Sequence, residues 1–325
     1  MFKIGDIQID KKVILAPMAG ITSFGYRKFM SRFGVGYVVT EMISDMGLIY
    51  GNEETKSYLK FENSGLPTCA QLFGSNPETL AMAAKIALEI NPNIAFFDIN
   101  MACPVKKVTS TGAGSSLMNN PQLCGEIVKS VKAATGLSVT VKIRLGFDKD
   151  HLTFKEVIKE VSAAGCSLVT IHPRTAKEMY SGLPHWDLVK DLRKEMGIPL
   201  LVSGNINTVD DALNALKITG ADGVMVARGG VGNPTLIKNI NHYFNNEEFE
   251  STDLSTQISY CKELVKNLID EKGELVAMRV SRGIVTKFFD GFKNSKKLKN
   301  RLSTELVTYS DLENILKDYI QENYV

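Results

Sequence analysis

Lys142 stands between Val141 and Ile143 within the β-rich run 139–144. A charge inside an apolar strand is costly unless it meets an anion. If the side chain points into the interior, it can stabilise negative charge that develops on a bound group. The alternative is a lysine that points outward at a strand end, where lysines commonly lie. The first interpretation predicts chemistry on an electron-rich ligand.

Cys103 is the cysteine whose surroundings favour a chemical role. It lies in a loop-like segment shortly before Lys106 and Lys107. A thiol with the reference pKa of ~8.5 is mostly protonated at neutral pH and can donate a proton. It can also act as a nucleophile, although no neighbour in the sequence provides a base. A buried small residue is the alternative. We interpret the four other cysteines as buried small residues, because they lie in strand or helix patterns; they are Cys69, Cys124, Cys166 and Cys261.

Glycines follow two consecutive β-rich runs near the end of the alternating region. Gly204 follows the first, and Gly229 and Gly230 follow the second. Backbone N–H groups in such turns commonly bind phosphate, and Arg228 would add positive charge. A simple turn explains each glycine alone. Their joint position favours a phosphorylated cofactor.

Short β-rich runs that alternate with amphipathic helical patterns must position these residues. The predicted strands are Val13–Ala16, Tyr37–Glu41, Thr68–Phe73, Ala95–Asn100, Val139–Arg144, Leu168–His172, Pro199–Ser203 and Gly223–Ala227. The predicted helices include Pro77–Ile90, Pro121–Thr135, Phe154–Ala164, Trp186–Met196 and Thr208–Ile218. Near-continuous apolar strands are typical of a parallel sheet covered on both faces. Eight such units predict an α/β fold, a (β/α)8 TIM barrel; a doubly wound open sheet is the alternative.

In a barrel of this kind the active-site groups lie just beyond the carboxyl ends of the strands. The rule selects Pro17, Met18, Ala19, Gly20, Gln71, Asn100, Met101, Ala102, Cys103, Pro104, Lys142, Arg144, His172, Pro173, Arg174, Ser203, Gly204, Asn205, Ala227, Arg228, Gly229 and Gly230. The set contains a lysine, a histidine, arginines, amides and a thiol. It contains no carboxylate cluster, so we predict no metal site.

Composition limits the class of protein. The 325 residues are 44% hydrophobic and 23% charged, which is typical of globular proteins and excludes disordered, collagen and coiled-coil classes. No run approaches the ~20 apolar residues of a membrane span, and the N-terminus lacks the pattern of a secretory signal. Five scattered cysteines without CxxC spacing argue against a disulfide framework or zinc site. We therefore expect a cytoplasmic protein without membrane contact.

The composition changes towards the C-terminus. We expect the barrel over residues 1–243, a polar linker over 244–255, and a small all-helical domain over 256–325. The helical patterns there are Leu254–Lys272, Leu275–Asp290 and Asp311–Tyr324. At the other end, alternation around Gly5-Asp6 predicts a hairpin that closes the bottom of the barrel.

Several motifs together resemble the tRNA-dihydrouridine synthase family, in particular its bacterial B-type branch. They are APMAGIT (16–22), QLFGSNP (71–77), DINMACPVKKV (98–108), GAGSSLM (112–118), VKIRLG (141–146), HPRT with MYSG (172–182) and ARGGVGNP (227–234). The resemblance runs from about residue 3 to beyond 285. Three positions depart from the family pattern: Pro173 replaces a usual glycine, Ser203-Gly204-Asn205 replaces NGD, and Ala227-Arg228-Gly229 replaces GRA.

The resemblance implies an FMN-bearing TIM barrel, followed by a helical tRNA-binding domain, that uses NADPH to reduce particular tRNA uridines to 5,6-dihydrouridine. A hydride would reach C6 of the uracil through FMN, and the Cys103 thiol would protonate C5. By the same resemblance, the cofactor-binding residues are Pro17, Met18, Ala19, Gln71, Lys142, His172, Ser203, Gly204, Asn205, Ala227 and Arg228. Asn100 and Arg144 would position the uracil, and we add Arg174 as a substrate-binding candidate.

Charge is distributed unevenly along the chain. The whole sequence carries a formal net charge of +2, but residues 276–301 hold eight basic residues against Asp290 alone. Phe288, Phe289 and Phe292 are interleaved with them, which favours a surface that follows a phosphate backbone. A solvated helix face is the alternative. The predicted RNA-binding residues are Lys106, Lys107, Arg279, Arg282 and Lys287.

Three alternatives remain open at this point. One is another FMN barrel that acts on a free pyrimidine, similar to dihydroorotate dehydrogenase. A second is a dihydrouridine synthase that acts on ribosomal RNA. The third is an RNA-binding protein that has kept the barrel and lost catalysis. No obligate protein partner is implied by any of them.

Overall fold

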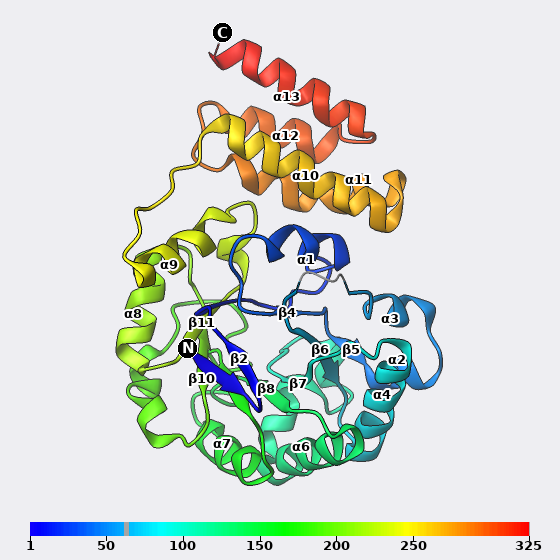
Figure 1. Ribbon diagram of the computed structural model, residues 1–325, viewed down its shortest axis with the longest axis vertical. Coiled ribbons are helices and arrows are strands. Elements are labelled where there is room, and N and C mark those ends of the chain that lie inside the picture. The colour runs from blue at the N-terminus through cyan, green and yellow to red at the C-terminus, as the bar shows by residue number, and fades with distance from the viewer. Residues whose placement is uncertain (62–64, 325) are drawn as a thin grey trace.

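The computed structural model describes residues 1–61 and 65–324, and within this part of the chain a ring of parallel strands is surrounded by helices (Figure 1). The strands of the ring are β3 (Val13–Leu15), β4 (Val38–Val39), β5 (Ile43–Ser44), β6 (Thr68–Phe73), β7 (Phe96–Met101), β8 (Val139–Ile143), β9 (Leu168–Ile171), β10 (Leu200–Ser203) and β11 (Gly223–Val226). Their order is β3-β11-β10-β9-β8-β7-β6-β4, with β5 also paired to β6. The predicted TIM barrel is confirmed.

The eight predicted strands all form, within a few residues of their expected ends. The largest difference is at the run predicted as Tyr37–Glu41, of which only β4 is paired, in parallel with the start of β6. Next to β4, the Gly36 N–H donates to the Val13 carbonyl at 2.9 Å, which draws the two ends of the sheet together. The short strand β5 was not predicted, because two paired residues give no periodic signal.

The N-terminal hairpin also forms as expected. Strands β1 (Phe2–Ile4) and β2 (Ile7–Ile9) pair antiparallel, and Gly5 takes the positive φ of +58° that the turn requires. Their buried faces pack on apolar residues inside the barrel, including Phe96, Leu168 and Leu201 near the amino ends of their strands. The hairpin therefore covers the amino ends of the strands and leaves the carboxyl ends open.

Helices surround the ring on its outer side. They are α1 (Phe24–Ser31), α2 (Asp45–Ile49), α3 (Glu53–Ser57), α4 (Pro77–Ile90), α5 (Lys106–Thr109), α6 (Pro121–Thr135), α7 (Phe154–Ala163), α8 (Val209–Thr219) and α9 (Thr235–Asn245), with 3₁₀ segments at Gly114–Asn119 and Arg228–Gly230. Local signals set several of their starts: Asn76 caps α4 with proline at the first position, and Thr208 with Asp211 forms a capping box on α8.

The helix predicted over Trp186–Met196 is wrong. The structure has two short 3₁₀ segments there, Trp186–Val189 and Leu192–Glu195. Between them Lys190 is extended and Asp191 adopts a left-handed φ of 53°, while the Asp191 N–H donates to the Ile218 carbonyl. A tertiary hydrogen bond to the end of α8 has taken the place of a helical one, and the periodic pattern alone gave no sign of it.

The C-terminal helices stack against the outer side of the barrel beside α1 (Figure 1). They are α10 (Leu254–Lys272), α11 (Glu274–Val285), α12 (Ser295–Thr304) and α13 (Tyr309–Tyr324), with a 3₁₀ turn at Thr286–Phe289. The expected linker 244–255 is non-helical only over 246–253, and the expected helix Leu275–Asp290 ends early. Helix α12 was not predicted, because its basic sequence carries few apolar positions. Val325, the end of the expected helical domain, lies outside the described residues.

Within the described residues, no helix is long and apolar enough to cross a membrane.

Candidate active site

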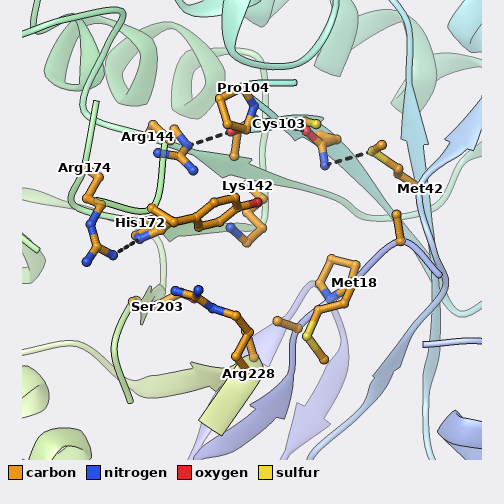
Figure 2. A pocket seen from close by; sticks show the side chains of 18 of the residues that line it. Met18, Met42, Cys103, Pro104, Lys142, Arg144, His172, Arg174, Ser203 and Arg228 are labelled. Carbon is orange, nitrogen blue, oxygen red and sulfur yellow. Dashed lines mark hydrogen bonds between the residues drawn. The ribbon is translucent and has the colours of Figure 1, made fainter. Parts of the chain in front are cut away.

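A cavity of about 380 Å³ opens at the carboxyl ends of the strands (Figure 2). Its lining includes all fifteen residues that we assigned to catalysis, cofactor or substrate, which are Pro17, Met18, Ala19, Gln71, Asn100, Cys103, Lys142, Arg144, His172, Arg174, Ser203, Gly204, Asn205, Ala227 and Arg228. These residues come from seven separate stretches of sequence, and parallel strands bring them to one edge because their carboxyl ends meet there.

Lys142 lies on β8 and lines this cavity rather than the outer surface. Burial and the charge of Arg144 lower its pKa to about 8, whereas Asp98 and Cys103 act in the opposite direction. An amine with a pKa near 8 is mostly protonated at neutral pH. Its ammonium group is therefore a cation that faces the cavity, in agreement with the functional interpretation of the strand.

Arg144 is only 1% exposed and joins the two loops that border the cavity. Its Nε donates to the Ala102 carbonyl at 2.8 Å, and its Nη1 donates to the carbonyls of Thr175 and Met179 at 2.8 and 2.7 Å. The ring of Tyr180 lies 5.5 Å from its guanidinium carbon. Nη2 makes no hydrogen bond to any described residue, so it is left for a ligand.

His172 follows β9 and is held by its neighbour Arg174. The Nη1 of Arg174 donates to His172 Nε2 at 3.0 Å, which leaves the ring proton on Nδ1. Burial, together with Lys142 and three arginines, lowers the pKa of His172 to about 2, so the imidazole is neutral. Arg174 also binds the carbonyls of Ser181 and Gly182 and the side chain of Asn205. It therefore braces the β9 loop against the β10 loop.

The glycine turns after β10 and β11 form one wall of the cavity. Gly204 has a φ of +121°, and a Cβ there would lie 2.8 Å from the His172 ring. A Cβ on Gly229 would lie 2.0 Å from the Ile206 carbonyl oxygen. The N–H groups of Gly204, Asn205 and Gly229 donate to no described group of the protein. Bare backbone donors beside Arg228 are the arrangement that binds phosphate.

Cys103 follows β7 and is the one partly exposed thiol among the five free cysteines. The other four are buried, and burial raises the pKa of each; they are Cys69, Cys124, Cys166 and Cys261. Their interpretation as core residues is confirmed. The N–H of Cys103 donates to Asn100 Oδ1 at 2.9 Å, which fixes the start of its loop.

Sequence reasoning gave no role to several residues that line the cavity. Tyr180 is the most prominent: it is 52% exposed, and its ring lies near the guanidinium groups of both Arg144 and Arg228. It falls within the quoted MYSG motif, so its position in the loop after β9 was the available signal. Met42 also lines the cavity, but a lone methionine before an unpredicted strand gave none.

The predicted RNA-binding residues are dispersed. Lys106 and Lys107 are exposed on α5, next to the cavity, whereas Arg279 and Lys287 are exposed in the C-terminal helices. Arg282 is half-buried, and its Nε donates to the Leu306 carbonyl at 2.8 Å, so it links α11 to the connection between α12 and α13.

The prediction that aromatic residues belong to the RNA-binding surface is wrong for two of them. Phe288 and Phe289 are 1% and 0% exposed and belong to the core. Phe288 packs edge-on against Phe29 of α1, and Phe289 against Tyr319 of α13. Their apolar rings join the helices to each other and to the barrel, which a linear pattern of charges and aromatics does not reveal.

Within the described residues, no group of histidine, cysteine and acidic side chains could hold a metal ion. The fold and the cavity together define the class: a TIM-barrel protein with a cationic site at the carboxyl ends of its strands.

Comparison with known proteins gives the family. The model of the dihydrouridine synthase (Dus) family matches residues 14–323. A probable tRNA-dihydrouridine synthase of Rickettsia conorii is 33% identical over 93% of this chain and 92% of its own length. The tRNA-dihydrouridine synthase B of Shewanella oneidensis is 30% identical over 98% and 99%. The chain belongs to the dihydrouridine synthase family, and this membership argues against the alternative resembling dihydroorotate dehydrogenase.

Solved structures support the fold. An old yellow enzyme homologue from Zymomonas mobilis superposes with a TM-score of 0.53 at 14% identity, covering 78% of this chain and 94% of the other. Morphinone reductase in complex with tetrahydroNAD gives a TM-score of 0.52 at 14% identity, covering 78% and 92%.

Proposed function

We propose that this protein reduces uridines of tRNA to 5,6-dihydrouridine, with FMN as cofactor and NADPH as reductant. One observation carries the proposal: the partly exposed thiol of Cys103 and the ammonium group of Lys142 line one cavity that also holds bare backbone donors. This combination provides a proton donor, a cation for developing negative charge, and a place for a phosphate. FMN, when bound, would supply the hydride for C6 of the uracil ring, and NADPH would replenish it.

The cavity fits FMN in two respects. The N–H groups of Gly204, Asn205 and Gly229, with Arg228, would hold the phosphate, since turns without side chains let the anion approach the backbone closely. The pyrimidine edge of the flavin becomes electron-rich on reduction, and Lys142 would stabilise that charge.

The remaining cofactor assignments follow from position. Gln71 and the neutral His172 would hydrogen-bond the flavin ring, while Pro17, Met18 and Ala19 would lie against it. Ser203 and Ala227 would support the phosphate turns. These roles stay predictions from family resemblance and from the location of each residue in the cavity.

Two groups in the cavity keep free donors for the uracil. Arg144 has used Nε and Nη1 on backbone carbonyls, and its Nη2 is available. Asn100 donates one amide hydrogen to Gln71, and its second faces Met42 Sδ at 3.9 Å, a weak contact that a uracil oxygen would replace. Both would bind uracil oxygens and hold the ring for protonation at C5 by Cys103. Arg174 would support this wall.

The substrate base must leave its stack to reach this cavity, at a cost of a few kcal/mol that is lowest in loops. That cost favours loop uridines of tRNA. We assign the chemistry to the barrel, 1–243, where Lys106 and Lys107 beside the cavity would contact phosphates. We assign the remaining tRNA binding to the helices that follow the linker, with Arg279 and Lys287 as phosphate contacts. The five unpaired cysteines suit the cytoplasm, where thiols stay reduced.

Replacing the thiol tests the proton-donor role. We expect Cys103→Ala to leave flavin reduction by NADPH within about twofold of wild type and to slow dihydrouridine formation by roughly 100-fold or more, the usual scale for a lost general acid. Rapid-mixing absorbance and mass spectrometry of the RNA measure the two steps. Cys124→Ala, at a buried thiol, is the matched control. Wild-type dihydrouridine formation by Cys103→Ala would overturn the role.

The RNA substrate is tested in cells. Dihydrouridine mapped in total RNA, with and without the gene, should disappear from specific tRNA positions in the deletion strain. Loss confined to ribosomal RNA would reject tRNA as the substrate while preserving the chemistry.

A further inference from the structure

A buried carboxylate below the cavity begins a row of hydrogen bonds that ends at Cys103. Asp98 lies on β7, 6% exposed, and both of its oxygens accept a hydrogen bond. Thr140 Oγ1 donates to Oδ1 at 2.6 Å, and Gln71 Nε2 donates to Oδ2 at 2.8 Å. Gln71 Oε1 accepts in turn from Asn100 Nδ2 at 2.9 Å. We call Asp98, Gln71 and Asn100 the amide chain.

The amide chain has a direction. Asn100 Oδ1 accepts from the N–H groups of Ala102 and Cys103 at 3.1 and 2.9 Å. An ionised carboxylate can only accept, so Asp98 requires the NH₂ group of Gln71 to face it. The carbonyl of Gln71 then faces Asn100, and the carbonyl of Asn100 faces the loop. The carboxylate at one end and the two loop N–H groups at the other therefore require the same orientation of both amides.

The groups around Asp98 act on its pKa in opposite directions, while the hydrogen-bond geometry presents a donor to each of its oxygens. Burial is the largest effect and raises the pKa of Asp98 above its ordinary value, whereas the hydrogen bonds from Thr140 and Gln71 and the nearby ammonium group of Lys142 act in the opposite direction. Tyr37 and Cys69, which also face it inside the barrel, are held neutral because burial raises the pKa of each. Donors thus meet both carboxylate oxygens, and the nearby cation is the same Lys142 that lines the cavity.

We propose that Asp98 is a positioning residue that aligns the amide chain and thereby holds the Cys103 loop in place for proton transfer. The inference rests on the proposed role of Cys103. An asparagine at 98 no longer enforces this orientation, because its NH₂ group can face Gln71, and both following amides would then turn. The NH₂ group of Asn100 would then face the N–H groups of residues 102 and 103, and donors facing donors would release the loop.

The test compares two variants of the full chain. In Asp98→Asn we expect dihydrouridine formation to fall about 30- to 100-fold, the scale of a misplaced reacting group. We also expect alkylation of Cys103 by iodoacetamide, without cofactor or RNA, to accelerate about fivefold, because a released loop exposes the thiol. Thr140→Val is the matched control: it removes the other hydrogen bond to Asp98 but leaves the direction of the amide chain, so alkylation should stay within about twofold of wild type.

A double variant tests whether the orientation of the amides, rather than a loss of packing at residue 98, causes the effect. In Asp98→Asn with Gln71→Glu, the new carboxylate accepts from both neighbours and restores the original direction towards Asn100. Its alkylation rate should return to within about twofold of wild type. Unchanged alkylation in Asp98→Asn, or no recovery in the double variant, overturns the proposal. If Asp98→Asn does not fold, the double variant alone decides: folded protein with wild-type alkylation supports the proposal, and any other result contradicts it.

Failure of this inference is distinguishable from failure of the proposed function. The alkylation rate needs neither FMN, NADPH nor RNA, and so reports on the loop even if Cys103 is not the acid. Conversely, Cys103→Ala tests the acid without touching the amide chain.

Discussion

Two groups of basic residues, one at the cavity and one among the C-terminal helices, differ in what balances their charge. In the cavity, no carboxylate of the described chain lies within ion-pair distance of Lys142, Arg144, Arg174 or Arg228. Arg144 and Arg174 are oriented by uncharged groups, mainly backbone carbonyls, and Arg228 lies over the ring of Tyr180. No ion pair within the described chain neutralises these four cations. Asp98 and Glu178 act on the pKa values of Lys142, Arg144 and Arg174 from a greater distance, so the positive charge is only partly balanced and favours an anionic ligand.

The C-terminal group is partly balanced by carboxylates of the chain itself. Lys299 pairs with Asp290 at 2.6 Å, Lys297 with Glu322 at 2.7 Å, and Arg301 with Asp318 at 3.1 Å. Only part of the local excess of positive charge therefore faces solvent without a partner. The comparison teaches that basic residues indicate a ligand where the fold separates them from carboxylates, and indicate helix packing where it does not.

Loss of Lys142 should have the largest effect. We expect Lys142→Met to slow dihydrouridine formation about 100- to 1000-fold, the scale for removing a preorganised charge from an active site. Single-turnover measurements with reduced enzyme and tRNA test this. Lys159→Met, at an exposed lysine on α7, is the control and should retain full activity. Equal rates in both variants would remove the distinction between cavity and surface cations.

Arg228 tests the phosphate end of the cavity. We expect Arg228→Ala to weaken FMN binding about 10- to 100-fold, since a hydrogen bond to a charged group contributes about 1.5–3 kcal/mol. Fluorescence titration of the cofactor-free protein measures the affinity. Arg193→Ala removes an arginine that is already paired with Asp222 at 2.6 Å, so it should bind FMN like wild type. A similar loss in both variants would contradict the assignment.

The pH dependence of stability tests whether Lys142 is an unbalanced cation. Its folded pKa of about 8 lies below the ordinary 10.5. The unfolded chain therefore holds this proton more tightly, so the charge destabilises the fold fully below pH 8 and progressively less between pH 8 and 10.5. In the cofactor-free protein, Lys142→Met should raise the free energy of unfolding by about 1–3 kcal/mol at pH 7, and this increase should disappear by pH 10.5. Denaturant unfolding at both pH values measures it, and an increase that is independent of pH would refute the shifted pKa.

Arg279 and Lys299 provide the smallest expected effect. Arg279 is exposed without an ion-pair partner among the described residues, whereas Lys299 is paired with Asp290. We expect Arg279→Ala to weaken tRNA binding about three- to tenfold and to lower the salt slope by about one, while Lys299→Ala changes affinity less than about twofold. Binding titrations from 50 to 200 mM salt, roughly the range where phosphate contacts are most visible, test this. Identical losses of tRNA affinity in the two variants would show that an ion pair within the protein does not reduce the contribution of a basic residue to binding.

The sequence was sufficient for the strands and for the cavity because both depend on local patterns. Short apolar runs such as 168–171 and 200–203 predict buried parallel strands, and the barrel rule then places whatever follows them at one edge. That is why Lys142, Cys103 and Gly204 could be grouped from the sequence. The helix expected at Trp186–Met196 failed because a tertiary hydrogen bond at Asp191 outweighed a periodic pattern.

The C-terminal helices show what local patterns cannot provide. Phe288 and Phe289 were read as part of a surface, yet they pack on Phe29 and Tyr319, which are distant in sequence. In the same way, the ring of Tyr180 lies in the cavity wall because it contacts Arg144 and Arg228, which are distant from it in sequence. Contacts between segments far apart in the chain decide which side of a helix or loop is covered.

The sequence by itself determined the barrel, the family and the identity of the groups that meet at the carboxyl ends of its strands. The tertiary structure alone decided which charges remain unbalanced. An ion pair forms only when two groups come within about 4 Å, and the partners of Lys297 and Arg301 lie 25 and 17 residues further along the chain. For Lys142 the fold leaves no carboxylate within that distance among the described residues. Asp98 acts on its charge only from further away, so the position of an ion-pair partner is open to a ligand.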